Sequence, residues 1–229
     1  MFRQKNSDLR RYEKTVLKYE AKPVETGKIL FYGSSGFGRW KAAHGNRPLE
    51  EDIRMKDGSP AAVNHGFGGS TMEEGLYYYD RLVKPWAPRA IVLRFFPNDV
   101  SWGYTPEEIV YLHSLFVHRA AADFPGIRIF ICDAMPHQRY VNNKLWQTIA
   151  KRYNRLISDY CDSREDLTLV DQSRFPGFYP DPEKIGDYSA IRQDIWQEDQ
   201  LHFTQDGYDI YRDLFLNALD ELLQGGCNA

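Results

Sequence analysis

The chain has 229 residues, of which 42% are hydrophobic and 14% aromatic, so one domain can bury a core without disulfides or metals. The net charge of −3 comes from 29 Lys and Arg intermixed with 32 Asp and Glu, and without a basic stripe a nucleic-acid partner is not expected. Cys132, Cys161 and Cys227 are odd in number and widely spaced, which predicts neither a zinc site nor a disulfide framework.

The N-terminal residues predict neither a targeting segment nor a membrane anchor. No apolar run follows Met1, and Asp8 and Glu13 place acidic charge where a transit peptide has little. No later stretch approaches the length that crosses a bilayer. We therefore expect a cytoplasmic protein with no membrane partner.

Residues 7–20 are predicted to form a short amphipathic helix with Ser7 as its N-cap, ending before Pro23. Its apolar positions are Leu9, Tyr12, Val16, Leu17 and Tyr19. We assign residues 1–25 as an N-terminal helical extension that covers one edge of the domain, with a dimer contact as the alternative.

From residue 28 the chain alternates between short apolar runs and helical stretches, which predicts a single α/β domain over residues 1–229. The runs are unbroken, as in strands covered on both faces. They are Lys28–Tyr32, Ala61–Asn64, Ala90–Phe96, Ile127–Cys132 and Leu167–Val170. Five such strands predict a three-layer α/β/α sandwich around a parallel, doubly wound sheet. Ligands bind such sheets at the carboxyl ends of the strands.

Several helices have recognisable starts. Ser70–Glu73 and Thr105–Glu108 each have the sequence of a capping box, the second with Pro106 at the first helical position. Residues 142–161 and 205–223 are predicted to be longer helices, and Thr204 caps the last one. Residues 172–200, rich in Pro, Gly, Asp and aromatics, are predicted to be irregular and to flank the active site.

Two glycine-rich turns follow the first two predicted strands. In Gly33–Gly38 the hydroxyl of Ser35 would be exposed at the carboxyl edge of the sheet, with its N–H at the start of the next helix. The same sequence is also consistent with a phosphate-binding loop, or with an ordinary turn that has no ligand. Asn64–Thr71 follows the second strand, and its glycines let the backbone approach a ligand closely, although an ordinary tight loop fits equally well.

Two further segments carry polar side chains. Phe96–Asp99 follows the third strand, and the Asn98 amide could donate to a developing oxyanion or belong to a simple turn. In Asp199–Thr204 the carboxylate of Asp199 can accept Nδ1–H of His202 and leave Nε2 free as a base. The four segments together supply a serine, oxyanion donors and an oriented imidazole, which indicates a serine hydrolase.

This set of motifs resembles the SGNH, or GDSL-type, hydrolase family over about residues 28–219. The resemblance implies a flavodoxin-like SGNH hydrolase fold, with Gly33-Ser34-Ser35 in place of the family's Gly-Asp-Ser and Ser35 as the nucleophile. Asp199 and His202 match the family's final Asp-x-x-His, so the implied catalytic residues are Ser35, His202 and Asp199.

The resemblance also implies an oxyanion hole formed by the backbone N–H groups of Ser35 and Gly69 and the side-chain amide of Asn98, with no metal or cofactor. Two positions depart from the family. Ser34 replaces its Asp, and we expect catalysis to survive. Phe96 replaces the glycine of the third block, and its bulk could narrow the pocket or shift the amide.

The resemblance implies an ester of a small acyl group, often acetyl on a carbohydrate. Phe67, Phe96 and Trp102 lie on the crevice loops and could contact this substrate or simply pack the domain. Arg192 could meet an anionic substrate, but we take it as a solvated surface arginine.

Two other functions are consistent with parts of the sequence. A non-catalytic carbohydrate-binding module on the same fold would result if Phe96 had spoiled the oxyanion hole. A nucleotide or phosphate binder could use Gly33–Gly38, although this turn lacks the lysine of a P-loop. An α/β-hydrolase is disfavoured because Phe37 stands where its Gly-x-Ser-x-Gly elbow needs the last glycine.

Overall fold

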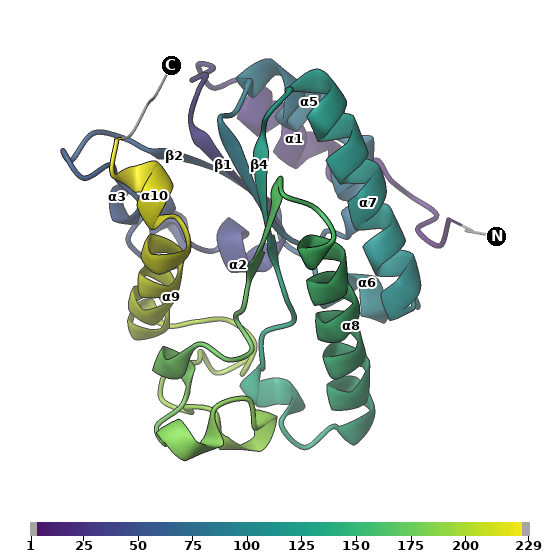
Figure 1. The fold of residues 1–229 in the computed structure, drawn as a ribbon, viewed down its shortest axis with the longest axis vertical. Helices are drawn as coiled ribbons and strands as arrows, with labels where there is room; N and C mark the ends of the chain where they lie inside the picture. The colour runs from purple at the N-terminus through teal and green to yellow at the C-terminus, as the bar shows by residue number, and fades with distance from the viewer. Residues whose placement is uncertain (1–3, 226–229) are drawn as a thin grey trace.

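The computed structural model describes residues 4–225, which form a five-stranded parallel sheet with helices on both faces (Figure 1). The strand order is β2-β1-β3-β4-β5, and every neighbouring pair is parallel. The strands are β1 (Ile29–Gly33), β2 (Ala62–Gly66), β3 (Ala90–Arg94), β4 (Arg128–Cys132) and β5 (Leu167–Val170). The predicted fold class is therefore confirmed.

The third strand is shorter than predicted. It ends at Arg94, and Phe95 and Phe96 leave the sheet. Phe96 precedes Pro97, whose ring nitrogen has no hydrogen to donate to a strand ladder. The loop after β3 therefore begins two residues earlier than the apolar run Ala90–Phe96 suggests.

The helices divide between the two faces of the sheet (Figure 1). One face is covered by α1 (Glu13–Glu20), α4 (Met72–Tyr77), α5 (Tyr79–Leu82), α7 (Pro106–Asp123) and α8 (Lys144–Asp162). The other is covered by α2 (Ser35–Gly38), α3 (Leu49–Asp52), α9 (Gln205–Ala218) and α10 (Asp220–Leu223). A further turn of helix, α6 (Asn98–Ser101), lies in the loop after β3.

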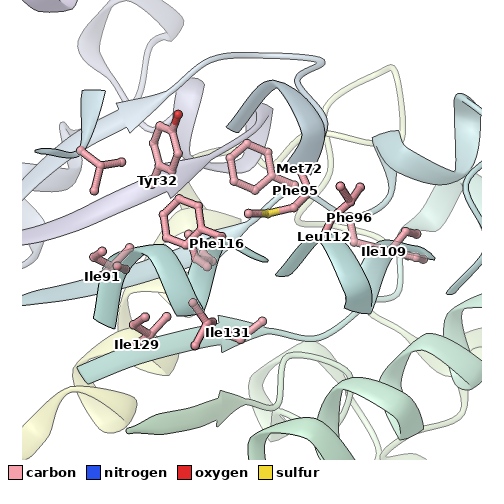
Figure 2. Close-up of a cluster of buried hydrophobic side chains, with 14 of the residues drawn as sticks. Tyr32, Met72, Ile91, Phe95, Phe96, Ile109, Leu112, Phe116, Ile129 and Ile131 are labelled. Carbon is pink, nitrogen blue, oxygen red and sulfur yellow. The ribbon is translucent and has the colours of Figure 1, made fainter. Parts of the chain in front are cut away.

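Alternate strand residues enter two separate cores, because successive side chains of a strand point to opposite faces. Figure 2 shows the first core, which contains Tyr32, Ile91 and Ile131 of the sheet together with Leu112 and Phe116 of α7. Their strand neighbours, such as Phe31 and Val92, enter the second core with α2 and α9. Both faces are apolar, which explains why the strand sequences are unbroken apolar runs.

The N-terminal helix begins later than predicted. It starts at Glu13 and has no side-chain cap, so Ser7 is not its N-cap. The Asn6 side chain accepts a hydrogen bond from the Asp8 N–H at 3.0 Å, and Asp8 accepts one from the Arg10 N–H at 3.0 Å. These local turns compete with the helix for the backbone donors. Residues 1–3 of the predicted extension lie outside the described residues.

The first capping box is displaced by one residue from the prediction. Thr71, not Ser70, caps α4, and its partner is Glu74 rather than Glu73. Ser70 still belongs to the preceding turn, where its N–H donates to the Phe67 carbonyl at 3.3 Å. The Thr105–Glu108 box and the Thr204 cap are confirmed.

The remaining elements follow the predicted pattern with two refinements. The last helix divides at Leu219 into α9 and α10. Residues 172–200 contain only 3₁₀ turns, at Pro176–Phe178, Pro182–Lys184 and Tyr188–Ala190. Cys132 and Cys161 are buried free thiols, and Cys227 lies outside the described residues. Within residues 4–225 no helix is both long and apolar enough to cross a membrane.

Candidate active site

Ser35 is presented at the carboxyl edge of the sheet by the turn between β1 and α2. A Cβ on Gly33 would lie 2.3 Å from the Arg94 carbonyl oxygen of the adjacent strand, so only glycine fits there. Ser34 donates its N–H to the same oxygen at 2.8 Å and is the N-cap of α2. Ser35 is the first residue of that helix and is partly exposed.

The loop after β2 lies directly against Ser35. The Phe67 N–H donates to the Gly33 carbonyl at 2.9 Å, and a Cβ on Gly68 would lie 3.6 Å from the Ser35 Cβ. Gly69 has a φ of +79°, which favours glycine. Its carbonyl accepts a hydrogen bond from the Arg11 guanidinium at 2.9 Å, so the N-terminal segment fixes this loop from outside.

Asn98 begins α6 in the loop after β3 and is tied to the second loop. Its side-chain amide donates to the Ser70 carbonyl at 2.9 Å, and an asparagine amide has a second hydrogen for another acceptor. Asp99 is fully buried and accepts the Met72 N–H at 2.8 Å. Burial raises the pKa of Asp99 to about 7. These bonds hold the loops that carry Gly69 and Asn98 in a fixed relation.

His202 is oriented by Asp199 in the turn before α9. The Asp199 carboxylate lies 2.6 Å from Nδ1 of His202 and also accepts the N–H groups of Leu201 and His202, at 3.0 and 2.9 Å. Partial burial opposes ionisation of Asp199, but these hydrogen bonds outweigh it and lower its pKa to about 2. The carboxylate therefore stays ionised, and Nε2 of His202 is left for another partner.

Two opposing effects act on the imidazole. Burial lowers the pKa of His202 from its ordinary value of 6.5, and the hydrogen bond to Asp199 offsets part of this decrease. The positive charges of Arg39 and Arg94 lower it further. At neutral pH the imidazole is therefore uncharged and able to accept a proton.

Ser35 and His202 line the same cavity, together with Asn98. The other lining residues are Gly36, Arg94, Pro97, Met135, His137, Tyr140, Leu201, Phe203 and Tyr208. The cavity volume is about 30 Å³, close to the volume of one water molecule in the liquid. In a free enzyme, the hydrogen bond between the nucleophile and its base is often long, and it tightens when substrate binds.

The predicted substrate-binding aromatics do not line this cavity. Phe67 is 1% exposed and packs edge-on against Tyr12. Phe96 belongs to the core shown in Figure 2, and its ring stacks on Tyr153 with centroids 4.6 Å apart. Trp102 lies under the Arg11 guanidinium at 4.8 Å. Phe67 and Phe96 are therefore held in the interior, and Trp102 is held against Arg11.

The segment 172–200 also differs from its expected place. It reaches His202 through Asp199, but none of its residues is among those lining the cavity. Several of them line a separate, open groove, including Arg192. Arg192 forms an ion pair with Asp194 on the surface, as expected of a solvated arginine.

Sequence reasoning missed Arg94, Met135, His137 and Tyr140. Met135 and His137 follow β4, so the rule that ligands bind at the carboxyl ends of strands could have suggested them. Arg94 was detectable as the one charged residue in the apolar run Ala90–Phe96. No group of three His, Cys, Asp or Glu side chains in residues 4–225 is arranged to hold a metal ion.

Comparison with known proteins gives a family match. The profile of the GDSL-like Lipase/Acylhydrolase family matches residues 31–210, and no curated protein matches the chain. Among solved structures, a GDSL-like lipase from Bacteroides thetaiotaomicron is 17% identical with a TM-score of 0.68, covering 94% of this chain and 100% of that one. A lipase/acylhydrolase from Enterococcus faecalis is 17% identical with a TM-score of 0.61, covering 86% and 97%. An acetyl xylan esterase is 15% identical with a TM-score of 0.62, covering 84% and 99%.

Proposed function

Because the chain belongs to the GDSL-like lipase/acylhydrolase family, we propose that it is a serine esterase that removes a small acyl group, acetyl foremost, from a carbohydrate or another small alcohol. One observation carries the proposal. Ser35 and His202 line a single cavity, while the Asp199 carboxylate holds the far side of the imidazole at 2.6 Å. A nucleophile, a base and an orienting acid in this order are the parts of acyl transfer.

In the proposed first step, Nε2 of His202 takes the hydroxyl proton of Ser35 as the oxygen attacks the ester carbonyl. A positioned base contributes about 10²- to 10⁴-fold to such a step. The carbonyl oxygen becomes an oxyanion and accepts hydrogen bonds from the N–H groups of Ser35 and Gly69 and from the Asn98 amide. Each such donor is worth on the order of 10²- to 10³-fold in turnover.

Collapse of the tetrahedral intermediate expels the alcohol, which takes the proton from His202 and leaves an acyl group on Ser35. Water then attacks this acyl-enzyme with His202 again as base, and the carboxylic acid departs. Asp199 steadies the imidazolium in both halves of the reaction without being protonated, in keeping with its lowered pKa of about 2.

Cavity size supports a small acyl group. The cavity volume of about 30 Å³ is small beside the several hundred Å³ of pockets that enclose drug-sized ligands. Phe96, the residue that motivated the binding-module alternative, points into the core and stacks on Tyr153. Nothing in its position favours a non-catalytic protein over an esterase.

Labelling with a fluorophosphonate and mapping the modified peptide tests the nucleophile. We expect label on Ser35, and we expect Ser35→Ala to lower hydrolysis of p-nitrophenyl acetate by on the order of 10³-fold or more. Ser163→Ala, an exposed serine after α8, is the matched control and leaves the rate unchanged.

Acetylated sugars compared with longer acyl esters then test the substrate class. We expect kcat/KM to fall as a neutral alkyl acyl chain lengthens, because the cavity beside Ser35 is small. Label on another serine, or folded protein that hydrolyses no ester, would refute the esterase and favour the binding module.

A further inference from the structure

Arg94 is a buried cation at the floor of the candidate active site. It is the last residue of β3, its exposure is 4%, and its side chain lines the cavity with Ser35 and His202. Burying a guanidinium is costly unless an anion or several hydrogen-bond acceptors compensate its charge. The protein supplies little of this compensation.

Among residues 4–225, the guanidinium makes one hydrogen bond, from Nε to the side-chain oxygen of Gln172 at 3.3 Å. It also lies over the Tyr211 ring, 5.8 Å from the centroid. No carboxylate of these residues is within 4.0 Å of it. A guanidinium has five N–H donors, so most of them have no protein acceptor.

The guanidinium also lies very close to the nucleophile. A Cβ on Gly36 would be 2.1 Å from Nη1 of Arg94, so a larger residue after Ser35 would displace this side chain. The N–H groups of the Arg94 guanidinium therefore lie against Gly36, the residue after Ser35. A ligand group that reaches the floor of the cavity meets it there.

The rest of the cavity lining supplies no negative charge to compensate Arg94. It contains no Asp or Glu, and burial lowers the pKa of His137 to about 3, so that ring is neutral. At the rim, Arg39 lies 3.9 Å from the Asp199 carboxylate and donates to Gln197 at 3.0 Å. The hydrogen bonds of the Asp199 carboxylate go to the His202 turn.

We propose that the enzyme acts on esters that carry a carboxylate, and that Arg94 binds this carboxylate and so determines specificity. The proposal rests on the esterase function above and deepens it. A planar guanidinium matches a carboxylate through two parallel N–H···O bonds. The small cavity favours this flat group over a bulkier phosphate.

The carboxylate can belong to either half of the ester, and two substrate pairs distinguish the sources. p-Nitrophenyl hemisuccinate carries it on the acyl half, and its neutral partner is the succinamate ester. O-Acetylglycolate carries it on the alcohol half, and its partner is O-acetylglycolamide. The members of each pair differ in the charge of one group, so the ratio of their kcat/KM values, after subtraction of each ester's spontaneous hydrolysis, measures carboxylate recognition.

For wild type we expect a preference of about 10- to 100-fold for the charged member of one pair, the size of a charge-assisted hydrogen bond. Arg94→Met should remove most of this preference, and Arg94→Lys should retain part of it. Arg128→Met is the matched control, because Arg128 pairs with Glu221 on the surface and lies at the opposite, N-terminal end of its strand. A wild-type ratio near one in both pairs, or an undiminished ratio in Arg94→Met, overturns the proposal.

Thermal melting separates recognition from a structural role. Replacing a buried, poorly paired charge with an apolar side chain of similar length often maintains or raises stability, so Arg94→Met should melt at or above the wild-type temperature. Free succinate should raise the melting temperature of wild type and not that of Arg94→Met, while succinamide raises neither. A marked loss of stability in Arg94→Met together with no succinate effect on wild type would assign Arg94 to the scaffold.

The outcomes also separate this proposal from the esterase function. If wild type hydrolyses p-nitrophenyl acetate but shows neither charge preference nor succinate stabilisation, carboxylate recognition fails and the esterase stands. If no ester is hydrolysed, the esterase itself fails.

Discussion

At the scale of single residues, His202 shows how local contacts set a protonation state. Burial lowers the pKa of the imidazole, and the ionised Asp199 beside it restores only part of the loss. Asp199 can do this because its own hydrogen bonds keep it charged. The result is a base that is neutral at physiological pH and held by Nδ1.

The pH dependence of the reaction follows from this balance. The neutral imidazole is the active form, so kcat/KM should rise with pH through the pKa of His202 and level off above it. Because that pKa lies below 6.5, the midpoint should lie below 6.5. Asp199→Asn removes a contact that raises the pKa, so the midpoint should move lower while the rate falls by about 10²- to 10⁴-fold.

A pH profile of kcat/KM on p-nitrophenyl acetate measures both effects. His118→Gln, an exposed histidine on α7, should leave the profile unchanged. A midpoint at or above 6.5 in wild type would contradict the assigned base.

At the scale of elements, the caps decide where the helices begin. Thr105 and Glu108 exchange side-chain to backbone hydrogen bonds at the start of α7. They satisfy two N–H groups that have no partner within the helix. A start fixed in this way helps to hold the loop between β3 and α7, in which Asn98 lies.

Loss of this cap should destabilise the protein without affecting the site chemistry. Thr105→Ala is expected to lower the free energy of unfolding by about 1 kcal/mol. Thr148→Ala on α8 is the control, because its hydroxyl donates within the helix to the Lys144 carbonyl and caps nothing. Chemical denaturation of both variants measures the difference, and equal losses would argue against the cap.

At the scale of the whole molecule, buried carboxylates couple stability to pH. Burial raises the pKa of Asp99 from 3.8 to about 7. It also raises the pKa of Asp133. Between about pH 4 and pH 7 the folded state holds the Asp99 proton and the unfolded state does not. The contribution of Asp99 to stability therefore falls as pH rises through this window, opposite to the contribution of a salt-bridged carboxylate.

Asp99→Asn should remove this contribution. The amide oxygen of asparagine can still accept the Met72 N–H, while the titrating group is gone. Denaturation midpoints measured from pH 4 to pH 8 should therefore rise for Asp99→Asn relative to wild type as the pH increases to about 7. Asp80→Asn, on the exposed side of α5, is the control and should retain the wild-type slope.

The sequence predicted those features that depend on residues adjacent in the chain. All five strands lie within two residues of the predicted runs at each end, and the Thr105 and Thr204 caps are where expected. Ser7 and the Ser70 box were wrong because local turns at Asn6–Arg10 and Phe67–Ser70 take the same backbone donors. Where two local patterns compete, their sequence alone does not rank them.

The sequence by itself determined the fold class, because unbroken apolar runs have to be buried on both faces of a sheet. It also determined the pairing of Asp199 with His202, because three residues of one turn set that distance. Only the tertiary structure decided that Phe96 points into the core and that Arg94 faces the nucleophile. These outcomes depend on Tyr153, Gln172 and Gly36, which belong to other segments of the chain. The burial of a side chain is fixed by the surfaces that fold against it, and no local pattern records which surfaces those will be.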